Sequence, residues 1–226
     1  YVLSLNDAFV SKCVVQFPYL RNWAFHDNLI YQKSESNNTY ILPKINPNNC
    51  IAELSIDNDV KWVLKENHSQ NKTRFDLSIK QTTELVIESP NGISLRYCLN
   101  QIVEFSQFLS IALYGSQSPS SVLFSNSLNN LHSVLLYKKE DSINPNSSSL
   151  IKFDALKNKI PDMLRNWHEN YSDVAPISNY LIESLQKNKT FDVPDFLIIA
   201  QALDGYHKRF VNKKNGKDRR KYEDEI

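Results

Sequence analysis

One apolar stretch decides the fold, Leu99-Asn-Gln-Ile-Val-Glu-Phe-Ser-Gln-Phe-Leu-Ser-Ile-Ala-Leu-Tyr114. Apolar residues occupy more than half of its helical circumference, and Gly115 follows as a residue that can end a helix. A helix that is apolar on most sides is stable only when it is buried. The stretch therefore predicts a core helix that packs across the apolar side of a sheet.

Strand-forming segments flank this helix on both sides. Apolar β-formers alternate or cluster in Lys12–Phe17, Leu29–Gln32, Thr39–Leu42, Ile51–Ile56, Val60–Lys65, Arg74–Ile79, Glu84–Glu88, Ser121–Ser125 and Leu131–Tyr137. Polar residues between them, including His68–Lys72 and Gln81–Thr83, are typical of turns between antiparallel strands. Because such a sheet needs a layer over its apolar side, we expect an α+β fold: a mostly antiparallel β-sheet or sandwich with one buried helix.

The rest of the chain has helical periodicity only. Three segments each open with a proline, which suits a first helical turn: Pro161–Tyr171, Pro176–Gln186 and Pro194–Phe210. The polar segment Asp141–Ser149 before them predicts a loop. We therefore expect a β-rich N-terminal domain over residues 1–150 and a helical segment over residues 151–226.

The last of these helices has two distinct faces. A stripe at three- and four-residue steps predicts contact with a core: Phe196, Ile199, Leu203, Tyr206 and Phe210. Polar residues gather beside it: Gln201, Asp204, His207, Lys208 and Arg209. By periodicity alone, this polar row is equally typical of a solvated helix face.

A family resemblance enters here. The string Phe196-Leu-Ile-Ile-Ala-Gln-Ala-Leu-Asp-Gly-Tyr-His-Lys-Arg-Phe210 resembles the FL-x-x-x-QALE-x-YHRR signature that joins the N-terminal domain of ApeA-like proteins to their HEPN domain. The segment Leu164-Arg-Asn-Trp-His-Glu-Asn-Tyr171 is similar to the Trp-bearing helix that this family places upstream. The likeness is looser over Val60–Leu136, where only the order of strands and helix matches.

The resemblance implies a role in bacterial defence against phage. HEPN domains are helical bundles that dimerise and, when catalytic, cut RNA with an Arg and a His that are four to six residues apart, without a metal. On this basis RNA, a phage-derived trigger and a second copy of the full-length protein are the expected partners, and no cofactor is expected. The polar row would then contact RNA or support the catalytic pair; a dimer contact is the alternative.

The letters of the catalytic motif do occur once, in Arg21-Asn-Trp-Ala-Phe-His26. This match lies in a strand-rich region upstream of the Phe196–Phe210 helix, whereas the family's motif follows that helix. Seven arginines and five histidines also make a chance match frequent. We therefore expect no catalytic residue within these 226 residues, and a catalytic half downstream of them.

Charge, cysteine and glycine content limit which functions and binding sites the chain can have. A formal net charge of +1 predicts no strong non-specific attraction to nucleic acid or membrane, although the tail from Lys208 to Ile226 is locally basic. Cys13, Cys50 and Cys98 form no C-x-x-C pair, so neither a zinc knuckle nor a disulfide framework is predicted, and a cytoplasmic location fits best. Four glycines leave no phosphate-binding loop, and no apolar run is long enough to span a bilayer.

Two functions follow from these observations. The first is the non-catalytic N-terminal regulatory or sensing part of an ApeA-like HEPN ribonuclease. The second is a stand-alone β-sandwich that binds a carbohydrate or peptide. A weaker third hypothesis makes the basic tail a tether for nucleic acid.

Overall fold

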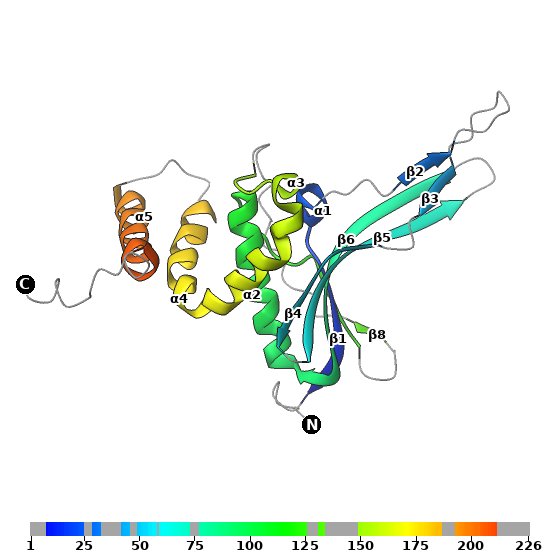
Figure 1. Cartoon of the computed structure of the whole chain (residues 1–226), viewed down its shortest axis with the longest axis horizontal. Helices are drawn as coiled ribbons and strands as arrows, with labels where there is room; N and C mark the ends of the chain where they lie inside the picture. The colour runs from blue at the N-terminus through cyan, green and yellow to red at the C-terminus, as the bar shows by residue number, and fades with distance from the viewer. Residues whose placement is uncertain are drawn as a thin grey trace, which may run out of the picture.

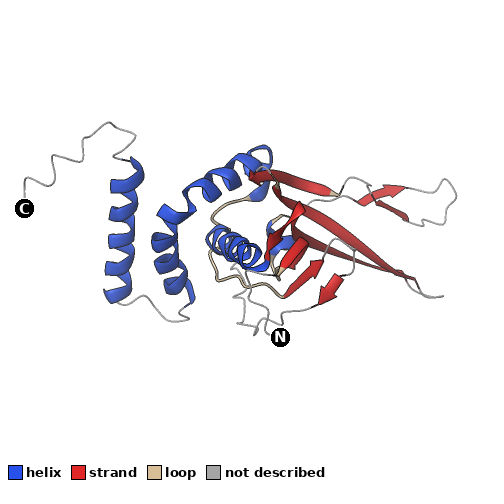
Figure 2. Ribbon diagram, turned by 90° about the horizontal axis from the view of Figure 1, so that it is seen from below, coloured by secondary structure: helices blue, strands red, loops and turns tan. Residues whose placement is uncertain are grey.

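In the computed structural model, the described residues are 8–24, 29–32, 42–45, 49–57, 59–72, 77–125, 131–133, 149–186 and 193–211. Strands lie on one side of the molecule and helices on the other, with α2 against the strands and α5 farthest from them (Figure 1, Figure 2). The prediction of an α+β fold with an antiparallel sheet, one buried helix and a C-terminal helical segment is confirmed.

Among the described residues, the main sheet has six strands in the order β4-β5-β6-β1-β7-β8, with antiparallel neighbours throughout. A separate small sheet pairs β2 with β3. The strands are β1 (Phe9–Gln16), β2 (Leu29–Gln32), β3 (Leu42–Ile45), β4 (Cys50–Asp57), β5 (Val60–Lys72), β6 (Leu77–Ser94), β7 (Ser121–Ser125) and β8 (Leu131–Ser133). Strand β3 begins at Leu42, where the predicted segment Thr39–Leu42 ends, and positions 39–41 lie outside the described residues. Positions 134–148 also lie outside them, and these include most of the predicted Asp141–Ser149 loop.

Strands β5 and β6 form a long hairpin that corrects two predictions. The polar segment His68–Lys72 is strand rather than turn, and Gln81–Thr83 continues β6 instead of separating two strands. Gln81–Thr83 lies opposite Glu66–His68, with Asn67 paired with Thr82 and His68 with Gln81, whereas Ser69–Lys72 lies opposite Leu77–Lys80. Because polar cross-strand neighbours can interact with one another, polar residues in register need not interrupt a ladder. Positions 73–76 lie outside the described residues.

Helix α2 (Leu95–Leu113) is the predicted core helix and covers the inner face of the sheet, the face that carries Trp62, Leu64 and Leu85. Its Phe105 is fully buried, with its ring centroid 5.7 Å from that of Trp62 on β5 and 5.6 Å from that of Phe17. The Trp62 contact is edge-to-face, with an interplanar angle of 89°, and such contacts add to the free energy of burial. The core thus lies between α2 and the central strands.

Both ends of α2 are capped. Ser94 ends β6 and accepts a hydrogen bond from the Tyr97 backbone N–H at 3.2 Å, so strand and helix join without a loop. At the other end Tyr114, rather than Gly115, takes the left-handed conformation (φ 51°). The N–H of Gly115 then donates to the Ser110 carbonyl at 3.0 Å, which is the 6→1 bond of a Schellman cap. The glycine therefore completes the cap beyond the left-handed residue.

The remaining helices are α1 (Leu20–Trp23), α3 (Phe153–Leu156), α4 (Ile160–Gln186) and α5 (Val193–Tyr206), with a 3-10 turn over Lys157–Lys159 and a π-helical turn, η2 (His207–Val211), after α5. Helix α4 corrects the prediction of two helices, because Pro176 lies inside it rather than at a start. The helix changes direction along its course (Figure 1), as expected for a proline that removes one backbone hydrogen bond. No helix among the described residues is long and apolar enough to cross a membrane.

Candidate functional site

Helix α4 connects the sheet domain to the C-terminal helix and is held to α2 at two places. At the first, Ile160 and Leu164 are fully buried in the core, and the Trp167 indole N–H donates to the Glu104 carbonyl at 3.2 Å. At the second, beyond Pro176, the Ser178 hydroxyl donates to Gln107 at 3.0 Å. These contacts hold the helix on the core on both sides of its proline, which explains why the proline does not end it.

The first attachment includes a buried acid–imidazole pair. His168 Nδ1 lies 2.8 Å from Glu104 Oε1, and the glutamate side chain is only 4% exposed. Burial raises the pKa of the Glu104 carboxyl, and the hydrogen bond with His168 opposes that shift. Burial, together with the nearby Glu104 charge, also raises the pKa of Tyr171. A hydrogen bond of this kind in a buried setting links α4 to α2 through a titratable group.

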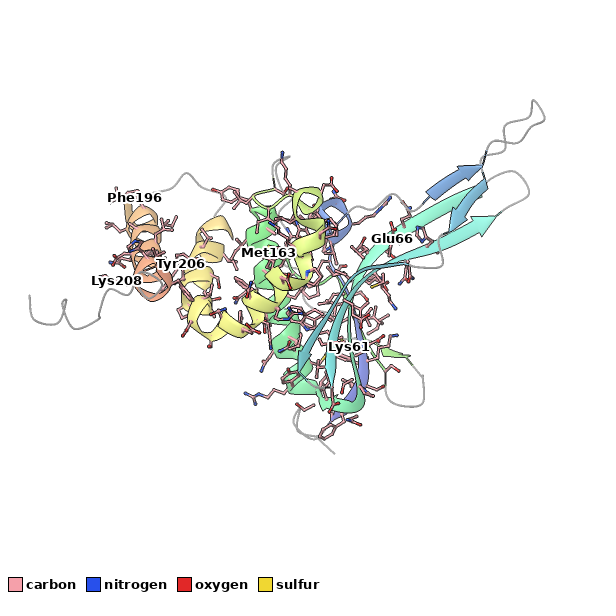
Figure 3. All side chains as sticks on the ribbon, viewed as in Figure 1. Lys61, Glu66, Met163, Phe196, Tyr206 and Lys208 are labelled. Carbon is pink, nitrogen blue, oxygen red and sulfur yellow. The ribbon has the colours of Figure 1, made fainter. Side chains whose placement is uncertain are left out.

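A groove of about 700 Å³ lies where α2, α4 and the end of α5 meet. Four aromatic side chains line it, Phe108 from α2, Trp167 from α4, and Tyr206 and Phe210 from α5 and η2. Tyr206 points from α5 toward α4, while Met163, another lining residue, lies on the opposite side near α2 (Figure 3). None of the described residues that line the groove carries a charge. The groove is therefore suited to an uncharged, largely apolar occupant.

A smaller cavity of about 300 Å³ lies between α2, the segment 116–119 and α4, and it is lined mainly by hydroxyl and amide groups. Those groups bond to one another. The Ser110 hydroxyl donates to the Ser106 carbonyl at 2.7 Å and accepts from the Gln117 N–H at 2.9 Å, while the Ser106 hydroxyl donates to the Gln117 carbonyl. These bonds tie the segment after α2 back onto the helix, which is a structural role.

The polar row predicted on the last helix lies on the surface. Gln201, Asp204, His207 and Lys208 are all exposed, and Asp204 pairs with Lys208 at 2.9 Å, one helical turn apart. The side chain of Arg209 is not among the parts of the chain that the structure describes. The structure thus leaves Gln201, Asp204, His207 and Lys208 open to solvent, and none of these four lines the groove. The role of the polar row as an RNA-contacting or supporting group stays a prediction.

The apolar stripe of the same helix corrects an expectation. Phe196 is 67% exposed, Leu203 63% and Tyr206 45%, whereas Ala202 is the buried position. Ile199 and Phe210 are half-buried, and Tyr206 and Phe210 line the groove with Trp167 of α4. Periodicity correctly predicted an apolar face; it did not predict that Phe196 and Leu203 on this face are exposed.

A second polar cluster was not predicted. The Arg21 guanidinium donates to Gln81 Oε1 at 2.5 Å, and Gln81 Nε2 lies 3.1 Å from His68 Nε2. The Gln81 carboxamide therefore bridges Arg21 and His68 through its two ends. Glu66, 1% exposed, lies 3.8 Å from the same imidazole.

The alternation of side chains along β5 could have predicted this cluster. Glu66 and His68 follow Trp62 and Leu64 at two-residue steps and so share the inner face of the sheet. Arg21, the first residue of the chance Arg–His motif, belongs to this network, while His26 lies outside the described residues. The cluster joins α1 to the long hairpin. Among the described residues no group of three or more His, Cys, Asp or Glu side chains could hold a metal ion.

Comparison with known families supports the resemblance seen in the sequence. The ApeA N-terminal domain 1 family matches residues 1–167. This chain belongs to that family. No curated protein and no solved structure matches it. The ApeA N-terminal domain as matched ends at Trp167, which lies inside α4 beside the groove and next to His168. The helix that carries the end of the ApeA domain therefore continues without a break toward the C-terminal helix.

Proposed function

We propose that this chain is the regulatory, sensing part of an ApeA-like HEPN ribonuclease that acts in bacterial defence against phage. The family match over residues 1–167 supports the ApeA assignment, and the signature at Phe196–Phe210 supports a HEPN region that begins in the C-terminal helices. The β-rich residues 1–150 would sense the trigger, and residues 151–226 would lead into the helical bundle. In this role the chain does no chemistry itself.

The observation that carries the proposal is the path of α4. One face of its first half packs in the core of the ApeA domain, with Leu164 2% exposed, and the same helix contacts α5. A trigger that changes how α2 packs would shift α4 at the Glu104–His168 contact, and α5 would move with it. Such a rigid connection between a sensing core and an effector helix gives two-state coupling a physical route.

The exposed stripe of α5 supplies the surface for the effector. Phe196, Leu197 and Leu203 are all more than half exposed, and an apolar face of this kind is stabilised when it packs into a helical bundle. In the full-length protein it would pack in the HEPN bundle or its dimer, which leaves the polar row Gln201, Asp204, His207, Lys208 and Arg209 free to contact RNA. Both assignments come from the family resemblance.

The test compares this chain with the full-length protein that carries it. The isolated 226-residue chain should leave RNA intact, whereas the full-length protein should cut it. His168→Ala in the full-length protein should change cleavage in the absence of a trigger, because it loosens α4. Lys61→Ala, which removes an exposed ion pair with Glu53 on the sheet, is the control and should leave cleavage unchanged.

Cleavage of RNA by the isolated chain, lost on His26→Ala, would overturn the proposal and revive the Arg21–His26 motif. The gene beyond Ile226 provides a second test. An Arg and a His that are four to six residues apart on a downstream helix would support a nuclease, and a stop codon there would favour the stand-alone binding protein.

A further inference from the structure

The groove between α2, α4 and α5 has an aromatic wall of defined geometry. Trp167 lies between Phe108 and Tyr171, with ring centroids 5.8 and 5.9 Å apart, so its orientation is held from both sides. On the opposite wall Tyr206 and Phe210 stack at 4.9 Å with an interplanar angle of 31°. Large apolar side chains fit between such walls, because aromatic rings bury much area at little entropic cost.

Two amide side chains, Asn166 and Asn170, also line the groove. Both are exposed and lie one helical turn apart on α4. Asn170 donates from its amide nitrogen to the Asn166 backbone carbonyl at 2.8 Å, which leaves its side-chain oxygen as an acceptor. The Asn166 amide has no hydrogen-bond partner among the described side chains, so it offers both a donor and an acceptor.

The spacing of these amides matches a peptide backbone. Residues four apart on a helix are separated by about 6 Å along its axis, and alternate residues of an extended peptide are separated by about 6.6 Å. A carboxamide can pair with both the N–H and the C=O of a peptide unit, whereas a nucleotide phosphate would require the positive charge that this groove lacks. We propose that the groove binds an extended, uncharged peptide segment with large apolar side chains at alternate positions.

In this arrangement the two amides hold the peptide backbone, and the aromatic walls take the apolar side chains. The peptide would bridge α4, which provides Trp167, and the end of α5, which provides Tyr206 and Phe210. Binding would thereby set the position of α5 relative to the ApeA domain. This last consequence rests on the proposed regulatory role; binding of the peptide does not.

The test measures, by titration calorimetry, how the 226-residue chain binds a capped pentapeptide with phenylalanine at its second position and leucine at its fourth. We expect saturable binding, no binding when both positions are lysine, and a clear loss when the backbone nitrogens are methylated. Asn166→Ala should weaken binding about tenfold, as for one or two hydrogen bonds. Asn100→Ala, an exposed asparagine near the other end of α2, is the matched control and should bind as the wild type does.

Three results would overturn the proposal. The first is no binding at millimolar peptide. The second is equal affinity for the methylated peptide together with an unchanged Asn166→Ala variant, which would show only a non-specific apolar surface or a small-molecule pocket. The third is a dimer that cross-links through Trp167, which would show a second copy in the groove. If the peptide binds but does not change cleavage by the full-length protein, the result would support peptide binding in the groove and contradict the regulatory role.

Discussion

Helices α4 and α5 both carry large apolar side chains, but several of those of α4 are buried, whereas several of those of α5 are exposed. In α4, Ile160 is fully buried and Leu164 is 2% exposed, because α2 and the sheet cover them. In α5, Phe196 and Leu203 are more than 60% exposed. The comparison shows that an amphipathic pattern predicts a face that seeks a cover, while the identity of the cover depends on what else is folded nearby.

The largest expected difference is between a core aromatic and an exposed one. Phe105→Ala should lower the free energy of unfolding by about 3–5 kcal/mol, because it empties the space between Phe17 and Trp62. Phe196→Ala should change it by no more than about 0.5 kcal/mol in this chain. Denaturant unfolding followed by tryptophan fluorescence measures both. A comparable loss in the two variants would show that the α5 stripe is covered after all.

The next effect concerns the contact that holds α4. His168→Ala should lower the free energy of unfolding by about 1–3 kcal/mol, since it leaves the buried Glu104 carboxyl without its imidazole partner. The double variant with Glu104→Gln should lose less than the sum of the two single variants, which a double-mutant cycle measures. Additive losses would indicate that the two side chains do not interact. Asp204→Ala on α5 is the control, because its ion pair with Lys208 is exposed.

Two glycines in different surroundings, Gly92 in β6 and Gly205 in α5, give a further test. Gly92 in β6 has a φ of +77°, so Gly92→Ala should destabilise the protein by about 1–2 kcal/mol. Gly205 lies inside α5 with nothing within 4 Å of an added Cβ, so Gly205→Ala should stabilise that helix by up to about 1 kcal/mol. Circular dichroism during thermal unfolding reports both changes. Loss of helix in Gly205→Ala would contradict the open surroundings of α5.

The smallest effect is a pH dependence confined to the α4 contact. Because burial raises the pKa of Glu104, the folded protein binds this proton more tightly than the unfolded chain does. The free energy of unfolding should therefore fall as pH rises from the ordinary carboxyl pKa to the raised one, relative to Glu104→Gln. Unfolding curves of the two proteins at several pH values test this. A difference that grows with pH, or none, would contradict the raised pKa; His168 and Tyr171 are the titratable groups near this carboxyl.

Much of the fold could be predicted because each signal was local. Alternating β-formers located β4 and β7, and the apolar circumference of Leu99–Tyr114 located α2. The failures came where distant residues compensate for a local signal. Gln81–Thr83 continues β6 because it lies opposite the polar residues Glu66–His68 of β5, and Pro176 stays inside α4 because Ser178 is held by Gln107 on α2.

The candidate site was less predictable. Helical spacing was enough to group Gln201 and Asp204 on α5, and His207 and Lys208 follow in the π-helical turn η2. The Glu104–His168 pair could not be predicted, because its residues are 64 positions apart in the chain. The groove could not be predicted either, because its residues come from α2, α4 and the end of α5. The division at residue 150 stays a prediction, while Phe153 and Ile160 pack in the same core as the strands.

The sequence by itself determined the family, the α+β class, the buried helix and the apolar and polar faces of α5, since these depend on residue order and period. Only the tertiary structure decided which faces are covered, where the acid and the imidazole meet, and that an uncharged groove lies between α4 and α5. The physical reason is that burial and pairing depend on elements far apart in the chain, and one helix's pattern carries no information about its partner.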